Sequence, residues 1–135
     1  MILVDSNILM YAAGADHPNK RPSAAFVERV ASSQIDAAID AEVLQEILHR
    51  YRAIRRWSDG RQVYDFARQV FAVVLPISAE ILDKARSLLD VHDTLTARDA
   101  LHAAAVEHHS LEAICSFDRD LDRVKGLRRV EPQDV

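Results

Sequence analysis

The feature that most constrains the fold of this chain is an alternation of short apolar runs with stretches of helical periodicity. Apolar side chains recur at the spacing of one helical face in residues 22–32, 41–57, 63–74 and 81–89, and residues 96–109 form a further helical stretch. The faces in residues 63–74 and 81–89 are expected to be buried, with Phe66, Leu82 and Leu89 among their side chains. Short apolar runs predict strands at residues 2–4, 37–39, 73–75, 113–115 and 127–130. This alternation favours a mostly parallel sheet with helices on both faces. We therefore expect an α/β fold, built as a single three-layer α/β/α domain over residues 1–135.

The composition excludes several classes of protein. With 49% hydrophobic and 28% charged residues, the chain resembles an ordinary globular protein rather than a disordered or membrane one. No apolar stretch approaches the ~20 residues of a membrane helix, and the first residues lack the pattern of a signal peptide. The only cysteine, Cys115, forms no internal disulfide, and its apolar neighbours predict a small buried side chain. We expect a cytoplasmic protein that does not enter a membrane.

The net charge of −4 argues against binding to nucleic acid through bulk positive charge. The 17 basic residues are nevertheless mostly arginine, whose planar guanidinium suits phosphate and carboxylate partners. In the segment HRYRAIRRW, helical spacing places His49, Arg52 and Arg56 in one stripe, with Arg50 nearer Glu46. Arg50, Arg52 and Arg56 are therefore candidate phosphate contacts. The alternative is a solvated helix face whose positive charge complements the helix dipole.

Four carboxylates occupy similar places along the chain. Asp5 follows the first predicted strand, Asp118 follows the fourth, and Asp99 lies in the opening turn of the helix that begins near residue 96. Glu46 lies within the helix predicted over residues 41–57. In an open parallel sheet, strand ends and the helix starts that follow them gather along one edge, where ligands bind. Asp5, Asp99 and Asp118 are expected to converge there, and Glu46 joins them if its helix points the same way.

Each acid also has a purely structural interpretation. Asp5 and Asp118 have the positions of N-caps, which contribute about 1 kcal/mol apiece. Asp99 lies three residues after a threonine, which resembles a capping box. Glu46 has Arg50 one turn later, a pairing worth roughly 0.3–0.5 kcal/mol on an exposed helix. Caps explain each acid singly and leave open why a further helix would carry a glutamate to the same edge.

Convergence of these acids would require a counter-charge. Two carboxylates at ~4 Å repel by about 4 kcal/mol at an effective dielectric of 20, so the group needs a cation or raised pKa values. No Cys or His is evident at metal spacing beside the acids, which favours Mg²⁺ or Mn²⁺ over zinc. His102, His108 and His109 do not form an HExxH pattern, and we expect surface histidines. Such a carboxylate site suits phosphodiester hydrolysis by a metal-activated water.

Four segments together resemble a known family. VDSNIL at the start, AEVLQEILHRY around Glu46, ARDALHAA around Asp99 and SFDRDLD around Asp118 are similar to the PIN-domain ribonucleases, and among them to the small VapC-type toxins of toxin–antitoxin pairs. The resemblance spans nearly the whole chain in the family's order. It implies a compact α/β/α fold with a central parallel sheet and a Mg²⁺-dependent endoribonuclease acting on RNA, with Mn²⁺ as a possible substitute.

The resemblance also implies roles for individual residues. Asp5, Glu46, Asp99 and Asp118 match the acidic catalytic quartet, and Asp5, Asp99 and Asp118 are taken as the metal ligands. Asn7 and Ser116 match the polar residues that support the quartet. Asp120 has the position to share the metal, whereas Asp122 reads as a surface charge. As partners the family implies a second copy of the chain, in a homodimer, and a cognate antitoxin whose C-terminal segment blocks the active-site groove.

Two other functions stay open at this point. A signalling receiver also places an acidic Mg²⁺ pocket on an α/β sheet, but Lys20, Lys84 and Lys125 do not stand where its phosphoryl-binding lysine is needed. The other alternative is a catalytically idle PIN-like module that only binds RNA or a protein. Metal-dependent cleavage of RNA separates the second alternative from the enzyme.

Overall fold

A five-stranded sheet, with the strand order β3-β2-β1-β4-β5, forms the centre of the molecule. A computed structural model describes residues 1–135, and in it every neighbouring pair of strands runs parallel. The strands are β1 (Ile2–Val4), β2 (Ala37–Asp40), β3 (Val74–Leu75), β4 (Ala113–Cys115) and β5 (Arg129–Val130). The chain adds β2 and β3 on one side of β1 and then returns to place β4 on the other. This reversal is the position at which parallel sheets bind ligands.

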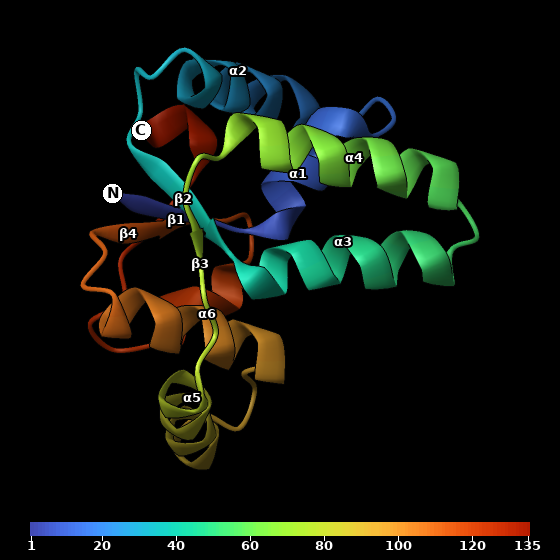
Figure 1. Ribbon diagram of the computed structural model, residues 1–135. Helices are drawn as coiled ribbons and strands as arrows, with labels where there is room; N and C mark the ends of the chain where they lie inside the picture. Colours follow the sequence, from blue (N-terminus) through green and yellow to red (C-terminus); the bar gives the residue numbers. More distant parts are fainter.

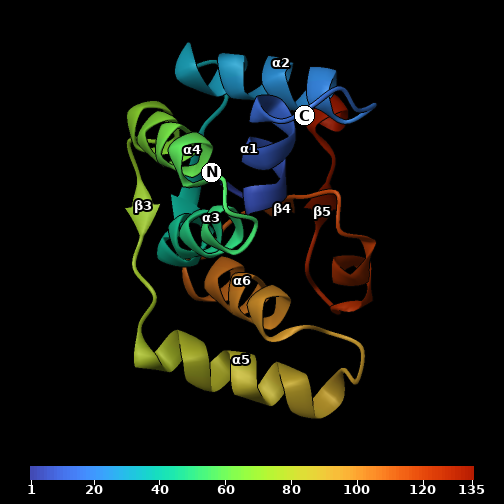
Figure 2. The same cartoon turned by 90° about the vertical axis from the view of Figure 1, so that its right-hand side faces the viewer.

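Six α-helices cover the two faces of the sheet. They are α1 (Ser6–Ala13), α2 (Lys20–Ala31), α3 (Ala41–Ala53), α4 (Trp57–Val70), α5 (Ala79–Val91) and α6 (Ala97–His108), with short 3₁₀ turns η1 (Arg119–Arg123) and η2 (Pro132–Asp134). Helices α1 to α4 lie on one side and α5 with α6 on the other (Figures 1 and 2). The expected three-layer α/β/α architecture is confirmed. No helix combines the length and the apolar character that a membrane span requires.

Alternating side chains of the central strands fill two separate cores. Val4 and Cys115 pack with the residues of α1 to α4, whereas Leu3 and Ile114 pack toward α6 and η1. Because successive side chains of a strand point to opposite faces, even three-residue strands serve both layers. Cys115 is fully buried, as its apolar neighbours indicate, and burial raises the pKa of its thiol to about 12.

The helix predicted over residues 41–57 ends earlier than its apolar periodicity suggests. Helix α3 stops at Ala53, and α4 begins at Trp57. Arg55 adopts a left-handed conformation with φ of 58°, which closes a turn in which the Arg56 amide donates to the Tyr51 carbonyl. Glycine usually marks such a turn, and none stands here. Arg56 therefore lies outside the helix that carries Arg52, and the expected single stripe of basic residues is broken.

Several other sequence-based assignments differ from the structure. Helix α1 has no predicted counterpart, because its apolar residues are contiguous rather than spaced by three and four. The stretch predicted as helical over residues 63–74 ends at Val70, and Val74 belongs to β3. Three side chains assigned to buried helical faces are in fact exposed by 42%, 49% and 38%, namely Phe66, Leu82 and Leu89. These helices leave apolar surface for other molecules to cover.

Candidate active site

The four acids singled out from the sequence meet in one pocket. Asp5 follows β1, Asp118 follows β4, Asp99 lies in the first turn of α6, and Glu46 lies in the middle of α3. All four line a cavity of about 250 Å³ at the carboxyl ends of the strands. Asn7 lines the same cavity. The topology thus places the predicted quartet at the edge where the strand order reverses.

Asp5 is held from two sides by neutral donors. The Ser116 hydroxyl donates to Oδ2 of Asp5 at 2.5 Å, and the Asn7 amide donates to the same oxygen at 2.9 Å. Asn7 also donates to the Ser116 oxygen at 3.0 Å, so the three side chains form one network. The Asp5 side chain caps no backbone amide of α1, which removes the N-cap interpretation. Burial raises the pKa of Asp5, an effect opposed by the nearby His102 charge and by the Ser116 hydrogen bond.

Asp118 combines a capping role with a place in the pocket. Its carboxylate accepts a hydrogen bond from the Asp120 amide at 2.9 Å, as the N-cap interpretation predicts. Asp120 itself does not line the pocket, and its half-exposed side chain lies 3.8 Å from Arg123. Asp122 pairs with Arg129 at 2.9 Å, away from the acids. Of the three acids in DRDLD, only Asp118 reaches the pocket.

Asp99 has a buried carboxylate oxygen without a hydrogen-bond partner. Thr96 caps its helix, with the Asp99 amide donating to Oγ1 of Thr96 at 3.2 Å. The carboxylate oxygen without a partner is Oδ2. Burial raises the pKa of Asp99 to about 6; the Thr96 hydrogen bond opposes this shift, and the neighbouring Asp118 carboxylate adds to it. An unpartnered buried oxygen beside other carboxylates fits a divalent cation.

Glu46 forms none of the expected contacts with Arg50. One carboxylate oxygen accepts a short hydrogen bond from the Ser6 hydroxyl, and the other lies 2.8 Å from Nε2 of His102. Burial by itself would raise the pKa of Glu46, but the hydrogen bond and charge of His102 outweigh burial and lower it. Glu46 is therefore ionised at neutral pH, and it lines the acidic pocket together with Asp118.

His102 is the residue that the sequence-based prediction missed. It was expected on the surface, but it is 1% exposed, and its Nδ1 lies 2.7 Å from the buried carboxylate of Asp40. Asp40 also caps α3 by accepting from the Val43 amide at 3.0 Å. The sequence does contain a signal, since Asp40 directly follows a predicted strand, as Asp5 and Asp118 do. Asp40 is the third acid that follows a predicted strand, and the sequence-based prediction overlooked it.

The side chains present fit a hard divalent ion. The expectation that no histidine stands beside the acids is wrong, because potential ligand atoms of Asp5, Glu46 and His102 lie within 4.8 Å of one another. Both nitrogens of His102 already face carboxylates, however, so the free donors in the pocket are carboxylate oxygens. Oxygen donors with an unpartnered Asp99 suit Mg²⁺ or Mn²⁺ better than zinc.

The arginines separate into two groups. Arg50 lines the acidic pocket, as does Arg98, which the sequence-based prediction did not include. Arg56 lines only a neighbouring groove, where it pairs with Asp59 at 2.7 Å. Arg52 lines neither cavity. Arg50 is therefore the predicted phosphate contact that stands nearest the acids.

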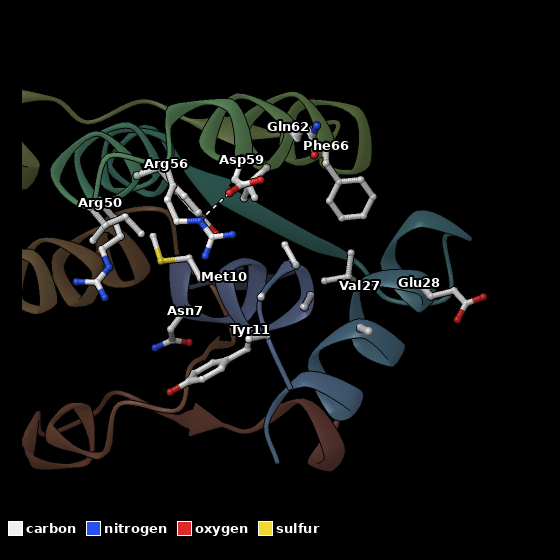
Figure 3. Close-up of a pocket in the computed structure, with 18 of the residues that line it drawn as sticks. Asn7, Met10, Tyr11, Val27, Glu28, Arg50, Arg56, Asp59, Gln62 and Phe66 are labelled. Carbon is white, nitrogen blue, oxygen red and sulfur yellow. Dashed lines mark hydrogen bonds and ion pairs between the residues drawn. The ribbon is translucent and has the colours of Figure 1, made fainter. Parts of the chain in front are cut away.

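A larger apolar groove adjoins the acidic pocket. It has a volume of about 1110 Å³ and lies among α1, α2, α3 and α4, with 12 hydrophobic residues among the 19 that line it. Figure 3 shows Met10, Tyr11 and Val27 on one side and Phe66 with Gln62 on the other. Asn7, Met10 and Arg50 line both cavities, so the groove continues into the acidic pocket.

The fold and this acidic pocket place the chain in a known class. The family model for the PIN domain matches residues 2–127, and the chain belongs to the PIN-domain family. This membership rules out the signalling-receiver alternative. Within the family, Ribonuclease VapC13 of Mycobacterium tuberculosis is 45% identical over 130 residues, covering 96% of this chain and 99% of that protein. The chain is thus a member of the VapC group of PIN-domain proteins.

Solved structures confirm the fold. VapC20 of Mycobacterium tuberculosis, described as a toxin that cleaves the sarcin–ricin loop, superimposes with a TM-score of 0.79 at 18% identity, covering 98% of this chain and all of that one. A toxin–antitoxin complex from Klebsiella pneumoniae gives a TM-score of 0.67 at 19% identity, covering 98% of both chains. At these identities the likeness concerns the architecture alone.

Proposed function

We propose that this chain is a divalent-metal-dependent endoribonuclease and the toxin of a toxin–antitoxin pair. The observation that carries the proposal is the meeting of Asp5, Glu46, Asp99 and Asp118 in one pocket, with an Asp99 oxygen that lacks a partner. The 45% identity to Ribonuclease VapC13 supports RNA as the substrate. A catalytically idle binding module would not need four carboxylates held in mutual repulsion.

We assign the metal to Asp5, Asp99 and Asp118, with Mg²⁺ as the ion and Mn²⁺ as a substitute. When bound by these residues, such an ion would supply positive charge at the scissile phosphodiester and would lower the pKa of a water. Glu46, ionised at neutral pH, would orient the attacking water and accept its proton. Asn7 and Ser116 fix the Asp5 carboxylate, so that the ligand geometry exists before RNA binds.

The substrate backbone enters over the rim of the pocket. Arg50 and Arg98 are the cations that line the pocket, and we assign them to phosphates that flank the scissile bond. Arg52 and Arg56 stay proposed contacts for phosphates farther along the strand. Contacts by single arginines rather than by a basic surface agree with the net charge of −4.

The adjoining groove is the proposed site of the cognate antitoxin. Its apolar lining suits an amphipathic segment of a partner, since burial of apolar surface drives such docking. Because Asn7, Met10 and Arg50 border both cavities, a segment in the groove also covers one side of the acidic pocket. Occupation of the groove would thus inhibit cleavage by blocking access of RNA.

A homodimer is the proposed assembly of the free toxin, and the cytoplasm its location. Leu82 and Leu89 are exposed on one side of α5, two turns apart on the outer layer. A second copy of the chain would cover them. Sedimentation velocity tests this proposal, because Leu82→Lys should shift a dimer toward the monomer without changing the fold.

The enzymatic proposal is tested with antitoxin-free protein, single-stranded RNA and Mg²⁺. We expect cleavage by the wild type and none above background by Asp5→Asn, whose amide removes a charge without changing the side chain's size. Asp83→Asn, on the exposed face of α5, is the matched control and should cleave like the wild type. Equal cleavage by Asp5→Asn would show that a contaminant was responsible.

A further inference from the structure

We propose that Asp40 and His102 form a buried relay that fixes the orientation of Glu46 in the acidic pocket. In this relay His102 is a positioning residue, which acts on the site through Glu46 and touches neither metal nor RNA. The inference rests on the proposed function, in which Glu46 orients the attacking water and therefore needs a carboxylate in a fixed orientation. The relay joins three elements, since Asp40 ends β2, Glu46 lies in α3 and His102 in α6.

The geometry of the relay is that of a rigid bridge. Nδ1 of His102 lies 2.7 Å from Oδ2 of Asp40, and Nε2 lies 2.8 Å from Oε1 of Glu46. A planar ring with partners at both nitrogens has one orientation available, and the side chain is 1% exposed. Asp40 is in turn fixed by the Val43 amide, to which its other carboxylate oxygen is bonded. Fixed contacts thus connect the backbone of α3, through Asp40 and His102, to the carboxylate of Glu46.

Glu46 needs such support because of its length. Its carboxylate turns on three side-chain torsions, and the last of them is broad. In the structure each of its oxygens meets one partner, Ser6 on one side and His102 on the other. These two contacts fix the carboxylate in the wall of the pocket that Asp5 and Asp99 also line. Loss of the His102 contact would release one oxygen to rotate.

A role for His102 as a core residue or as a metal ligand fits the structure less well. A purely structural core position would be filled at less desolvation cost by an apolar side chain, whereas Asp40 and His102 are polar and fully buried. A metal ligand needs a free nitrogen, and binding at Nε2 would break the contact with Glu46. His102 also lies behind the pocket, which Glu46 lines and His102 does not.

Two amide variants separate the two nitrogens of the ring. The amide nitrogen of glutamine can take the place of Nε2 and keep a donor to Glu46, whereas that of asparagine can take the place of Nδ1 and keep a donor to Asp40. Both are neutral and of similar polarity. His102→Gln therefore preserves the contact that the relay requires, and His102→Asn removes it.

The decisive readout is the dissociation constant of Mn²⁺, measured by calorimetry on the metal-free full chain. We expect His102→Asn to weaken Mn²⁺ binding about tenfold or more, because Glu46 would no longer hold its charge in place beside the three metal ligands, and to lower kcat with little change in KM. His102→Gln, which keeps the donor to Glu46 but loses the contact with Asp40, should fall between His102→Asn and the wild type in both. Melting temperatures of the two variants are compared to show equal folding. Equal dissociation constants for the two variants would overturn the relay.

Asp40→Ser provides a second test if the His102 variants do not fold. Serine keeps an N-cap oxygen for α3 but does not reach the ring, so His102 loses its anchor. We expect weaker Mn²⁺ binding in this variant, and an unchanged dissociation constant would also overturn the relay. Wild-type protein that neither binds Mn²⁺ nor cleaves RNA would instead refute the proposed function. The two failures are therefore distinguishable.

Discussion

The acidic pocket and the apolar groove share a border but are built in opposite ways. In the pocket, Asp5 and Glu46 are buried, and hydrogen bonds from Ser116, Asn7, Ser6 and His102 fix their oxygens. The groove is more than four times as large, mostly apolar, and its wall includes Phe66, which is 42% exposed. The pocket is preorganised for chemistry, whereas the groove offers apolar surface that a partner would cover.

Under the proposed function, catalysis and inhibition would depend on different residues of one continuous surface. The pocket needs charge at fixed positions, so replacing one carboxylate by an amide should lower the rate of cleavage strongly. The groove needs apolar area, so a substitution there should weaken binding of the antitoxin in proportion to the apolar area lost. Variants confined to one cavity should therefore leave the property of the other unchanged.

The largest effect is expected for Glu46→Gln in the pocket. Loss of the charge should lower the single-turnover rate of RNA cleavage by about a thousandfold, or about 4 kcal/mol, while the affinity for the antitoxin stays unchanged. Glu42→Gln is the matched control, one turn earlier on α3 and outside the pocket. A rate for Glu46→Gln within tenfold of the wild type would remove Glu46 from the chemistry.

A smaller effect is expected for Phe66→Asp in the groove. Placing a charge on the apolar wall should weaken binding of the cognate antitoxin by about a hundredfold, or about 2.7 kcal/mol, without changing cleavage by the free toxin. Gln69→Asp, exposed on the same helix but outside the groove lining, is the control for added charge. If the two variants bind the antitoxin equally well, the antitoxin does not bind in the groove.

Asp99 allows a test of electrostatic repulsion in the pocket. Its pKa in the folded protein, raised to about 6, exceeds the ordinary value of 3.8, so the folded state binds the proton more tightly. Ionisation of Asp99 therefore destabilises the metal-free fold fully above about pH 6, and this destabilisation fades as the pH falls toward 4. Asp99→Asn should raise the free energy of unfolding by about 1–2 kcal/mol at pH 7.

Urea unfolding of the metal-free protein at pH 7 and at pH 4.5 measures this difference. The gain in free energy of unfolding of Asp99→Asn over the wild type should shrink at the lower pH. It should be reversed when Mn²⁺ is added, because binding of the ion stabilises the folded wild type. A variant that is less stable than the metal-free wild type at pH 7 would contradict the repulsion.

The smallest effect is expected for the arginines at the rim. Arg50→Ala should weaken RNA binding severalfold and reduce the slope of log affinity against log salt by about 0.7, the value for one phosphate of a single strand. The double variant Arg52→Ala with Arg56→Ala should have a smaller effect, because Arg56 is already paired with Asp59. A larger change for the double variant would place the RNA along the turn between α3 and α4.

Sequence reasoning reached the acids because their position follows from topology. Parallel strands end at one edge, so Asp5 and Asp118 were expected together, and the capping pattern of Thr96 placed Asp99 at a helix start. The role of His102 was not visible, because its burial depends on how α6 packs against α3 and β2. An apolar helical neighbourhood gives no sign of two carboxylates arriving from other elements.

Two errors in the structure predicted from the sequence also have local causes. The end of α3 was missed because Arg55 adopts a left-handed conformation without the glycine that usually signals it. Phe66 was assigned to a buried face because periodicity reports which side of a helix is apolar and not whether another element covers it. In this chain that uncovered surface forms part of the wall of the groove.

The central claim is that the acids gathered at the ends of β1 and β4 act by binding a divalent ion. A titration of Mn²⁺ into EDTA-treated protein, with calorimetry and RNA cleavage measured on the same samples, tests it most directly. We expect no cleavage without the ion and the same midpoint for binding and for cleavage. Cleavage that continues at its full rate in EDTA would contradict the claim.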